Sequence, residues 1–269
     1  MVVVVKVGGS ILGEGIDPSV LDDIGAVAAK KQLILVHGGG RAVTETAKRL
    51  GKEQRFIVSP GGIRSRYTDL ETIKIYTMVM SGAVNKDIVT ALQKIGLPAV
   101  GLSGVDGALI KADRKKKLLV VDERGRKRAI DGGYTGKISS VNGNLLKTLL
   151  SEKYLPVVSP VALSEEFEYL NVDGDRAAAY VAGGVKADSV IFLTDVKGVL
   201  MEGELVKKLT SKEAEALRPK IGFGMEKKVL ASLEALSMGV KESIIASGLV
   251  KNPVASALAH RNCTVISDE

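Results

Sequence analysis

Cysteine is nearly absent from this chain of 269 residues, in which Cys263 stands alone. A single cysteine excludes an internal disulfide, and nothing else in the sequence favours an oxidising compartment. Long hydrophobic runs are also missing, because no apolar stretch approaches the roughly 18–20 residues that span a bilayer. The apolar start at residues 1–5 is followed at once by Lys6 and two glycines, which predicts a buried strand rather than a signal peptide. These absences favour a cytoplasmic protein without a membrane segment.

Three common nucleotide-binding sequences are absent as well. The chain has no Walker A sequence and no glycine loop of the protein-kinase type. It also lacks Gly-x-Gly-x-x-Gly after either of its first two apolar stretches. If the protein binds ATP, it must belong to a fold family that binds nucleotides without any of these three sequences.

Apolar, β-branched stretches alternate with helical patterns along most of the chain, and 45% of the residues are hydrophobic. This alternation predicts an α/β fold with a mostly parallel sheet and helices on both faces. The expected strands are 2–7, 33–36, 98–101, 155–159, 190–193, 243–246 and 263–266. The expected helices are 18–30, 41–50, 70–95, 142–152, 176–183, 212–217 and 226–238. The chain turns polar near 164–169, so we predict two lobes, 1–167 and 168–269.

Positive charge is concentrated in the segment 111–128, which carries most of the net charge of +7. Nine basic and three acidic residues give this segment a charge of +6. We expect a β-hairpin over 109–130 that turns at 123–125. Such a hairpin can attract an acidic partner or can simply be a solvated surface, and charge alone leaves both interpretations open. The segment has no aromatic residue, which argues against specific nucleic-acid binding.

Two glycine runs, at 8–9 and 38–40, each follow an apolar strand and precede a helical pattern. Free backbone N–H groups and the helix dipole attract anions at such a place. Lys6 ends the first strand, where an ammonium group is costly to bury unless it meets an anion. We therefore expect Lys6 to bind a phosphate. His37 precedes the second run, and we expect it to be hydrogen-bonded structure rather than a catalytic base.

Arginines, a paired Asn and Asp, and helix-start lysines mark the other candidate sites. Arg64 and Arg66 precede a long helix, and arginine suits the recognition of carboxylates. Asn171 and Asp175 lie four positions apart before a helix and can face one pocket, where the carboxylate would hold lysine ammonium groups. Lysines in the first turn of the helix at 226–238 are unfavourable with its dipole, which indicates a bound anion.

Six motifs, in this order, resemble those of the amino acid kinase family over nearly the whole chain: K-V-G-G-S, H-G-G-G, R-Y-T-D, N-V-D-G-D, L-T-D-V-K-G-V and G-M-E-K-K-V. Members of that family phosphorylate carboxylates or related acids with ATP. The resemblance, which is closest to the acetylglutamate kinase branch, implies a three-layer αβα sandwich with a mostly parallel central sheet. It assigns substrate binding to the N-terminal lobe and ATP binding to the C-terminal lobe, and the basic hairpin would be an addition.

The resemblance also implies roles for individual residues. Lys6 and Lys228 would stabilise the transferring phosphoryl group, and Asp175 would orient both lysines. The substrate-binding residues would be Gly39, Gly40, Arg66 and Asn171. The residues beside ATP would be Gly8, Gly9, Ser10, Thr194, Asp195, Lys197, Gly198, Gly222 and Met225. Mg²⁺ would be held mainly by phosphates and water, and the resemblance implies no metal ligand from the protein.

The loop G-G-I-R-S-R before Tyr67 departs from the N-G-L-R that is usual in acetylglutamate kinases. It is similar to the loop of kinases that phosphorylate α-aminoadipate or glutamate attached to a small acidic carrier protein of the LysW type. Those kinases serve lysine and arginine biosynthesis. An acidic carrier would be steered onto basic residues, and the residues implied are Arg64, Ser65, Lys115, Lys116 and Lys117.

Other readings of the chain are an acetylglutamate kinase that acts on free N-acetylglutamate and, more remotely, a non-catalytic nucleic-acid-binding or sensor protein with a kinase fold. The N-V-D-G-D spacing and the R-Y-T-D loop argue against the glutamate 5-kinase, uridylate kinase, carbamate kinase and aspartate kinase branches. The chain begins directly at its first strand, without the extra N-terminal helix of arginine-inhibited acetylglutamate kinases. We therefore expect a homodimer without that feedback rather than a hexamer.

Overall fold

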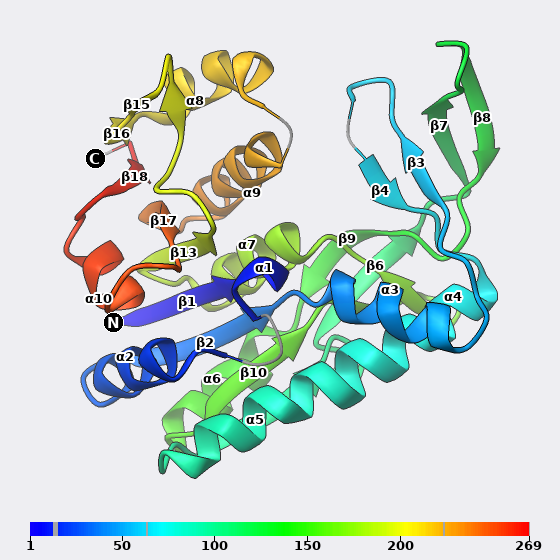
Figure 1. The fold of residues 1–269 in the computed structure, drawn as a ribbon. Coiled ribbons are helices and arrows are strands. Elements are labelled where there is room, and N and C mark those ends of the chain that lie inside the picture. The colour runs from blue at the N-terminus through cyan, green and yellow to red at the C-terminus, as the bar shows by residue number, and fades with distance from the viewer. Residues whose placement is uncertain (13–15, 63, 223, 269) are drawn as a thin grey trace.

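An eight-stranded sheet forms the centre of the computed structural model, which describes residues 1–12, 16–62, 64–222 and 224–268 (Figure 1). The strand order is β16-β18-β17-β13-β1-β2-β10-β5. In chain order these strands are β1 (Val2–Val7), β2 (Gln32–His37), β5 (Ala99–Ser103), β10 (Leu155–Ser159), β13 (Ser189–Thr194), β16 (Lys208–Leu209), β17 (Glu242–Ser247) and β18 (Cys263–Ile266). All neighbours are parallel except β17 and β18. The predicted mostly parallel sheet is confirmed.

Helices cover both faces of this sheet, because alternate strand residues point to opposite sides. Val3 and Val5 of β1 belong to the core cluster with α2 (Pro18–Ala28), α5 (Asn85–Lys94) and α10 (Pro253–Leu258). Val4 belongs to the cluster on the opposite face. The helices of that face are α6 (Gly143–Ser151), α7 (Gly174–Val185) and α9 (Met225–Ser237). Sheet and helices thus form the three expected layers.

The predicted lobes share this sheet. Strands β1, β2, β5 and β10 come from the first lobe and β13, β16, β17 and β18 from the second. β1 pairs with β2 on one side and with β13 on the other. The division at residue 167 therefore remains a prediction about function, within one continuous sheet. No helix in the described part of the chain is long and apolar enough to cross a membrane.

The helix predicted over 70–95 consists of three consecutive segments. These are α4 (Leu70–Thr77), a π-helical segment (Met78–Val84) and α5. A π-helical turn holds about one residue more than an α-helical turn. Over seven residues this hardly alters the apolar pattern, so the π-helical segment could not be predicted from the sequence. The remaining helices are α1 (Gly9–Leu12), α3 (Gly40–Arg49) and α8 (Ser211–Leu217), with 3₁₀ turns at Asp106–Ala108 and Arg218–Lys220.

The basic segment is divided between two sheets, which differs from the hairpin predicted over 109–130. Only β7 (Lys117–Val121) and β8 (Lys127–Asp131) form that hairpin. The preceding β6 (Ile110–Arg114) pairs with β9 (Gly136–Val141) and β11 (Val161–Leu163). Together with β12 (Tyr169–Asn171) they form a four-stranded sheet. Pairing partners so distant in sequence leave no local signal.

Two hairpins stand side by side at one end of the molecule (Figure 1). One is β7–β8. The other is formed by β3 (Phe56–Val58) and β4 (Arg64–Arg66), a short pair that the sequence pattern did not predict. A last small pair, β14 (Leu200–Met201) with β15 (Glu204–Leu205), lies beyond β13.

Candidate active site

The two glycine runs meet at the carboxyl ends of β1 and β2. These strands are neighbours in register, with Val7 opposite His37, so the residues that follow them are adjacent. The Gly38 N–H donates to the Val7 carbonyl at 2.9 Å. A Cβ on Gly38 would lie 2.9 Å from the Gly9 nitrogen, a distance that real Cβ atoms essentially never show. Glycine is needed here because the two backbones touch, and the two predicted anion-binding turns form one place.

Gly39 shows a second steric requirement. Its φ is +155°, in the region that favours glycine, and a Cβ there would lie 2.8 Å from the Sδ atom of Met80. Met80 belongs to the π-helical segment. This segment therefore packs directly against the second glycine run.

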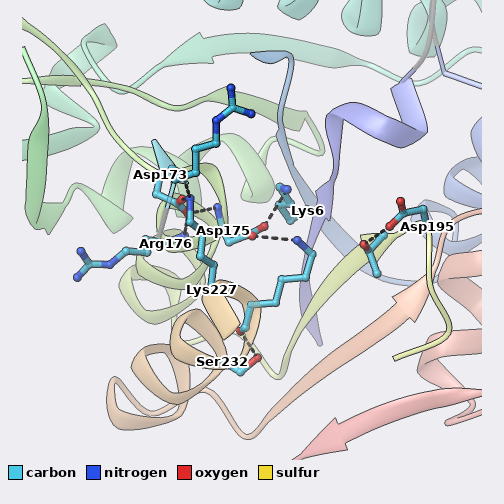
Figure 2. Close-up of polar contacts among 10 residues, drawn as sticks. Lys6, Asp173, Asp175, Arg176, Asp195, Lys227 and Ser232 are labelled. Atoms are coloured by element: carbon cyan, nitrogen blue, oxygen red, sulfur yellow. Dashed lines mark hydrogen bonds and ion pairs between the residues drawn. The ribbon is translucent and has the colours of Figure 1, made fainter. Parts of the chain in front are cut away.

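Asp175 lies between two lysines that come from different parts of the chain. Its carboxylate oxygens are 2.8 Å from Lys6 Nζ and 3.1 Å from Lys228 Nζ, and Figure 2 shows the contact with Lys6. Lys6 is the residue before the last in β1, and Lys228 lies in the first turn of α9. Asp175 lies in the first turn of α7, where the Asp173 side chain caps the helix by accepting hydrogen bonds from the Asp175 and Arg176 N–H groups.

The charges of this cluster determine its protonation. Burial raises the pKa of the Asp175 carboxyl, but Lys6 and Lys228 outweigh burial and hold that pKa at about 2. Asp175 is therefore ionised at neutral pH, although only 6% of its surface is exposed. Two ammonium groups and one carboxylate leave an excess of one positive charge. The structure brings together the three residues predicted to be catalytic, whereas their catalytic roles remain predictions.

His37 is buried, and both of its ring nitrogens have partners. Nδ1 lies 2.9 Å from the Gly38 carbonyl, and Nε2 lies 3.1 Å from the amide nitrogen of Asn85. Burial is the main cause that lowers the pKa of His37 to about 4, and the charges of Lys6 and Lys86 lower it further. A neutral histidine with this network is structural, as predicted. Asn85 was missed, although a polar side chain on the apolar face of the long helix was the available signal.

The residues predicted to bind the substrate line one cavity of about 630 Å³ together with Lys6, Asp175 and Lys228. Arg66 Nη2 donates to the Gly40 carbonyl at 2.8 Å and to Thr44 Oγ1 at 2.9 Å, while Nη1 contacts Gln54. The Asn171 amide donates to Thr68 Oγ1 at 2.9 Å. Gly39 and Gly40 lie in the same wall. Sequence reasoning missed Thr44 and Gln54, which hold the Arg66 guanidinium.

The residues predicted to border ATP lie in three separate segments around β1 and β13. Gly8 precedes α1, and Gly9 and Ser10 are its first residues. Gly222 precedes α9 and Met225 is its first residue, whereas Phe223 between them is outside the described residues. Thr194 is the last residue of β13, and Asp195, Lys197 and Gly198 follow this strand. Thr194 Oγ1 donates to Asp195 at 3.0 Å, and Figure 2 shows Asp195 apart from the Lys6–Asp175 contact. Apart from Ser10, whose side chain lies outside the described part of the chain, none of these residues lines the 630 Å³ cavity.

Within the described residues, no group of three or more His, Cys, Asp or Glu side chains is placed to hold a metal ion. At Gly198 a Cβ would lie 2.5 Å from Thr264 Oγ1. Close packing alone therefore explains why this position is a glycine.

The residues predicted to dock a carrier fall into two groups. Arg64 and Ser65 on β4 are exposed, as are Lys116 and Lys117 at the start of the β7–β8 hairpin. The Arg64 guanidinium lies over the Phe56 ring, 4.1 Å from its centre. Arg64 and Ser65 also line the 630 Å³ cavity, whereas Lys116 and Lys117 do not. Lys115 lines this cavity too and differs from all four in being half-buried.

Comparison with known proteins gives a family and close relatives. The model of the family described as "Amino acid kinase family" matches residues 1–247. A LysW-aminoadipate/LysW-glutamate kinase from Metallosphaera sedula is 48% identical over 264 residues, which cover 98% of this chain and 99% of that protein. A relative from Nitrosopumilus maritimus, provisionally given the same name, is 58% identical over 267 residues, which cover 99% of this chain and all of the relative.

Solved structures agree with the fold at lower identity. N-acetylglutamate synthase from Neisseria gonorrhoeae gives a TM-score of 0.79 at 23% identity, covering all of this chain and 59% of that chain. Carbamate kinase from Giardia lamblia gives 0.68 at 16% identity, covering 99% of this chain and 98% of that chain.

Proposed function

The chain belongs to the amino acid kinase family, and from that membership we propose that it is an ATP-dependent phosphotransferase. Its proposed acceptor is the side-chain carboxylate of α-aminoadipate or glutamate attached to a small acidic LysW-type carrier protein, and its product is an acyl phosphate. The observation that carries the proposal of phosphoryl transfer is the cluster in which Asp175 contacts both Lys6 and Lys228. The relatives at 46–58% identity over nearly the whole chain support the carrier-bound acceptor.

Electrostatics explains how this cluster would act. A carboxylate and a γ-phosphate repel each other, so the site must supply positive charge where they meet. Asp175 keeps Lys6 and Lys228 in place, and the excess positive charge of the three groups remains available to the transferring phosphoryl group. A carboxylate nucleophile needs no base. This agrees with the buried, neutral and fully hydrogen-bonded His37.

The two ends of the site would bind different substrates. In this proposal Arg66 and Asn171 bind the polar groups of the amino acid, and the backbone at Gly39 and Gly40 lies beside its reacting carboxylate. ATP would lie along the residues named above in α1, after β13 and at the start of α9. Mg²⁺ would enter with ATP, held by its phosphates and by water, and would offset phosphate charge. The site fits this mode because both oxygens of Asp175 already contact lysines.

The decisive experiment measures ATP- and Mg²⁺-dependent acyl phosphate formation, trapped as a hydroxamate. The acceptors are free N-acetylglutamate, free N-acetyl-α-aminoadipate and the same two amino acids attached to an acidic LysW-type carrier. We expect product from the carrier-bound acceptors. Activity on free N-acetylglutamate alone would contradict the proposal and would make the protein an acetylglutamate kinase.

We further propose that the paired hairpins β3–β4 and β7–β8 dock the acidic carrier. Their exposed Lys116 and Lys117 would attract it by long-range charge, which salt screens. Replacing both by Gln should raise KM for the carrier-bound substrate and flatten its dependence on salt, with KM for ATP unchanged.

The matched control for docking replaces Lys94 and Lys147, exposed lysines on α5 and α6, by Gln. It removes the same charge from elements outside the two hairpins and should leave the salt dependence as it was. Equal effects of both double variants would show that binding of the carrier depends only on the net charge of the protein, and this would contradict the proposal.

A further inference from the structure

Lys115 occupies a place that its lysine neighbours do not share. It lies between β6 and β7 in the wall of the 630 Å³ cavity, whereas Lys116 and Lys117 are exposed. The backbone holds it there, because the Lys115 N–H donates to the Thr135 carbonyl at 2.9 Å. A Cβ on Gly132 would lie only 1.5 Å from the Lys115 carbonyl oxygen, so this close approach requires glycine. The position of Lys115 is therefore built into the fold.

The Lys115 ammonium group lacks a partner in the part of the chain that the structure describes, since no hydrogen bond or ion pair engages it. Burial lowers the pKa of Lys115, and the positive charges of Arg176 and Lys137 lower it further, while Asp173 opposes them. The surroundings of this ammonium group are therefore short of negative charge. A bound anion would correct the imbalance.

Thr135 supplies an independent second observation at the same wall. Its side chain is half-buried, and its Oγ1 atom is shielded from solvent and has no hydrogen-bond partner. A buried hydroxyl without a partner is energetically unfavourable, because it has lost its hydrogen bonds to water. Thr135 lines the same cavity and is tied to Lys115 through its own carbonyl oxygen. An ammonium group and a hydroxyl, both able to donate, suit a carboxylate.

The proposed reaction leaves this pair unused. A free acetylated amino acid has two carboxylates, one that reacts beside Lys6 and Lys228 and one for Arg66 and Asn171. Lys115 is a further cation in the same cavity, two residues before the hairpin strand β7 begins. It thus lies between the reacting groups and the surface proposed to dock the carrier.

We propose that Lys115 and Thr135 form a carboxylate-binding subsite for the acyl group on the amino nitrogen of the substrate. This subsite selects substrates whose acyl group carries a carboxylate of its own. The inference rests on the proposed function and deepens it, because an acetyl group offers nothing to such a subsite. Free acetylated amino acids lack this additional carboxylate, and the subsite would therefore help to exclude them as substrates.

The test uses two small substrates of nearly equal size, N-succinyl-α-aminoadipate and N-succinamoyl-α-aminoadipate, in which a neutral carboxamide replaces the terminal carboxylate. A glutaryl and glutaramoyl pair extends the reach by one methylene. We expect the wild type to prefer the carboxylate in at least one pair by about tenfold or more in kcat/KM, as for a charged hydrogen bond. Lys115→Met should abolish the preference, and Thr135→Val should reduce it, with little change for the carboxamide.

Lys137→Met is the matched control, because this exposed lysine on β9 is close enough to influence Lys115 but does not line the cavity. It should retain the preference. Calorimetric binding of the same pairs is measured in parallel and needs no turnover. If no acceptor yields acyl phosphate, the proposed function fails, while the binding preference still decides the subsite.

The subsite is overturned if the wild type shows no preference in either pair, or if the preference survives in Lys115→Met. A rise in KM for ATP in Lys115→Met with an unchanged preference would assign this lysine to the nucleotide and would equally overturn the proposal.

Discussion

At the scale of single residues, opposing effects on one carboxyl group determine the charge of the site. Burial alone would favour a neutral Asp175, yet two lysines hold its pKa at about 2. The carboxylate in turn lets Lys6 remain in a nearly buried position, with 8% of its surface exposed. Asp175 is stabilised by both lysines, and each lysine is stabilised by Asp175, so removal of any one changes the electrostatics of the whole cluster.

The first prediction concerns the two lysines. Lys6→Ala or Lys228→Ala should lower kcat by at least about 10²-fold, because the transition state would lose charge stabilisation. Steady-state kinetics measures the effect, and circular dichroism checks that the fold remains intact. A well-folded variant with an unchanged rate would show that the replaced lysine does not take part in the mechanism.

The second prediction concerns His37 and acid stability. Its pKa is about 4 in the fold, below the ordinary value of 6.5, so folding favours the neutral ring. The stability that depends on this neutral ring is fully present above pH 6.5 and is lost as the pH falls toward 4, because the unfolded chain takes up the proton first. At about 1.4 kcal/mol per pKa unit, the loss is on the order of 3 kcal/mol.

Urea unfolding between pH 7 and pH 4 measures this loss. His37→Gln should be less stable at pH 7 but should show a flatter slope. The control is His260→Gln, which replaces the other histidine of the chain, an exposed one that contacts Glu242. An equal slope for wild type and His37→Gln would show that His37 does not cause the acid sensitivity.

At the scale of elements, buried polar side chains join helices that are far apart in sequence. Asp23 of α2 accepts hydrogen bonds from the Val254 N–H at 2.6 Å and the Ala255 N–H at 3.3 Å, at the start of α10. α10 has six residues and its N-cap side chain makes no capping bond, so Asp23 serves as its cap. Burial is the main cause that raises the pKa of Asp23.

The third prediction separates the charge of Asp23 from its hydrogen bonds. A raised pKa means that the fold disfavours the ionised form, and this cost grows as the pH rises above 3.8. Asp23→Asn keeps an acceptor without the charge and should match the wild type in stability at pH 7. Asp23→Ala leaves two N–H groups without partners and should cost about 1–3 kcal/mol. Thermal unfolding at pH 7 compares them, and equal losses in both variants would refute the capping role.

At the scale of the whole molecule, one sheet and one core join the two predicted lobes. β1 pairs with β13, and the core cluster around Val4 and Ile34 also contains Ala178 and Val190 from the second half. The site depends on this union, because Lys6 comes from the first half and Asp175 and Lys228 from the second. The homodimer expected from the family resemblance stays a prediction.

The fourth prediction is that the two halves unfold together. Strands of both halves belong to the same eight-stranded sheet. Denaturation followed by circular dichroism should therefore coincide with loss of hydrogen-exchange protection in both β2 and β17. Two transitions that divide near residue 167 would show that the lobes are independent folding units.

Much of the central sheet could be predicted from the sequence. Apolar β-branched runs predicted its main strands, and helical periodicity predicted the helices between them, because both signals depend on near neighbours in the chain. Lys6, Asp175 and the lysines at the start of α9 were also singled out in advance, although only the family resemblance selected Lys228 among those lysines. Each stands beside a strand end or in the first turn of a helix, where the local pattern itself indicates an unusual charge.

Tertiary structure decided which distant residues meet. The sequence placed Lys115 among the surface lysines of a hairpin, whereas the pairing of β6 with β9 puts it in the cavity wall beside Thr135. The β3–β4 hairpin and the contact between His37 and Asn85 were equally invisible beforehand. Strand pairing and burial depend on segments tens of residues apart, and the free energy that selects them comes from packing the whole chain, which no local pattern records.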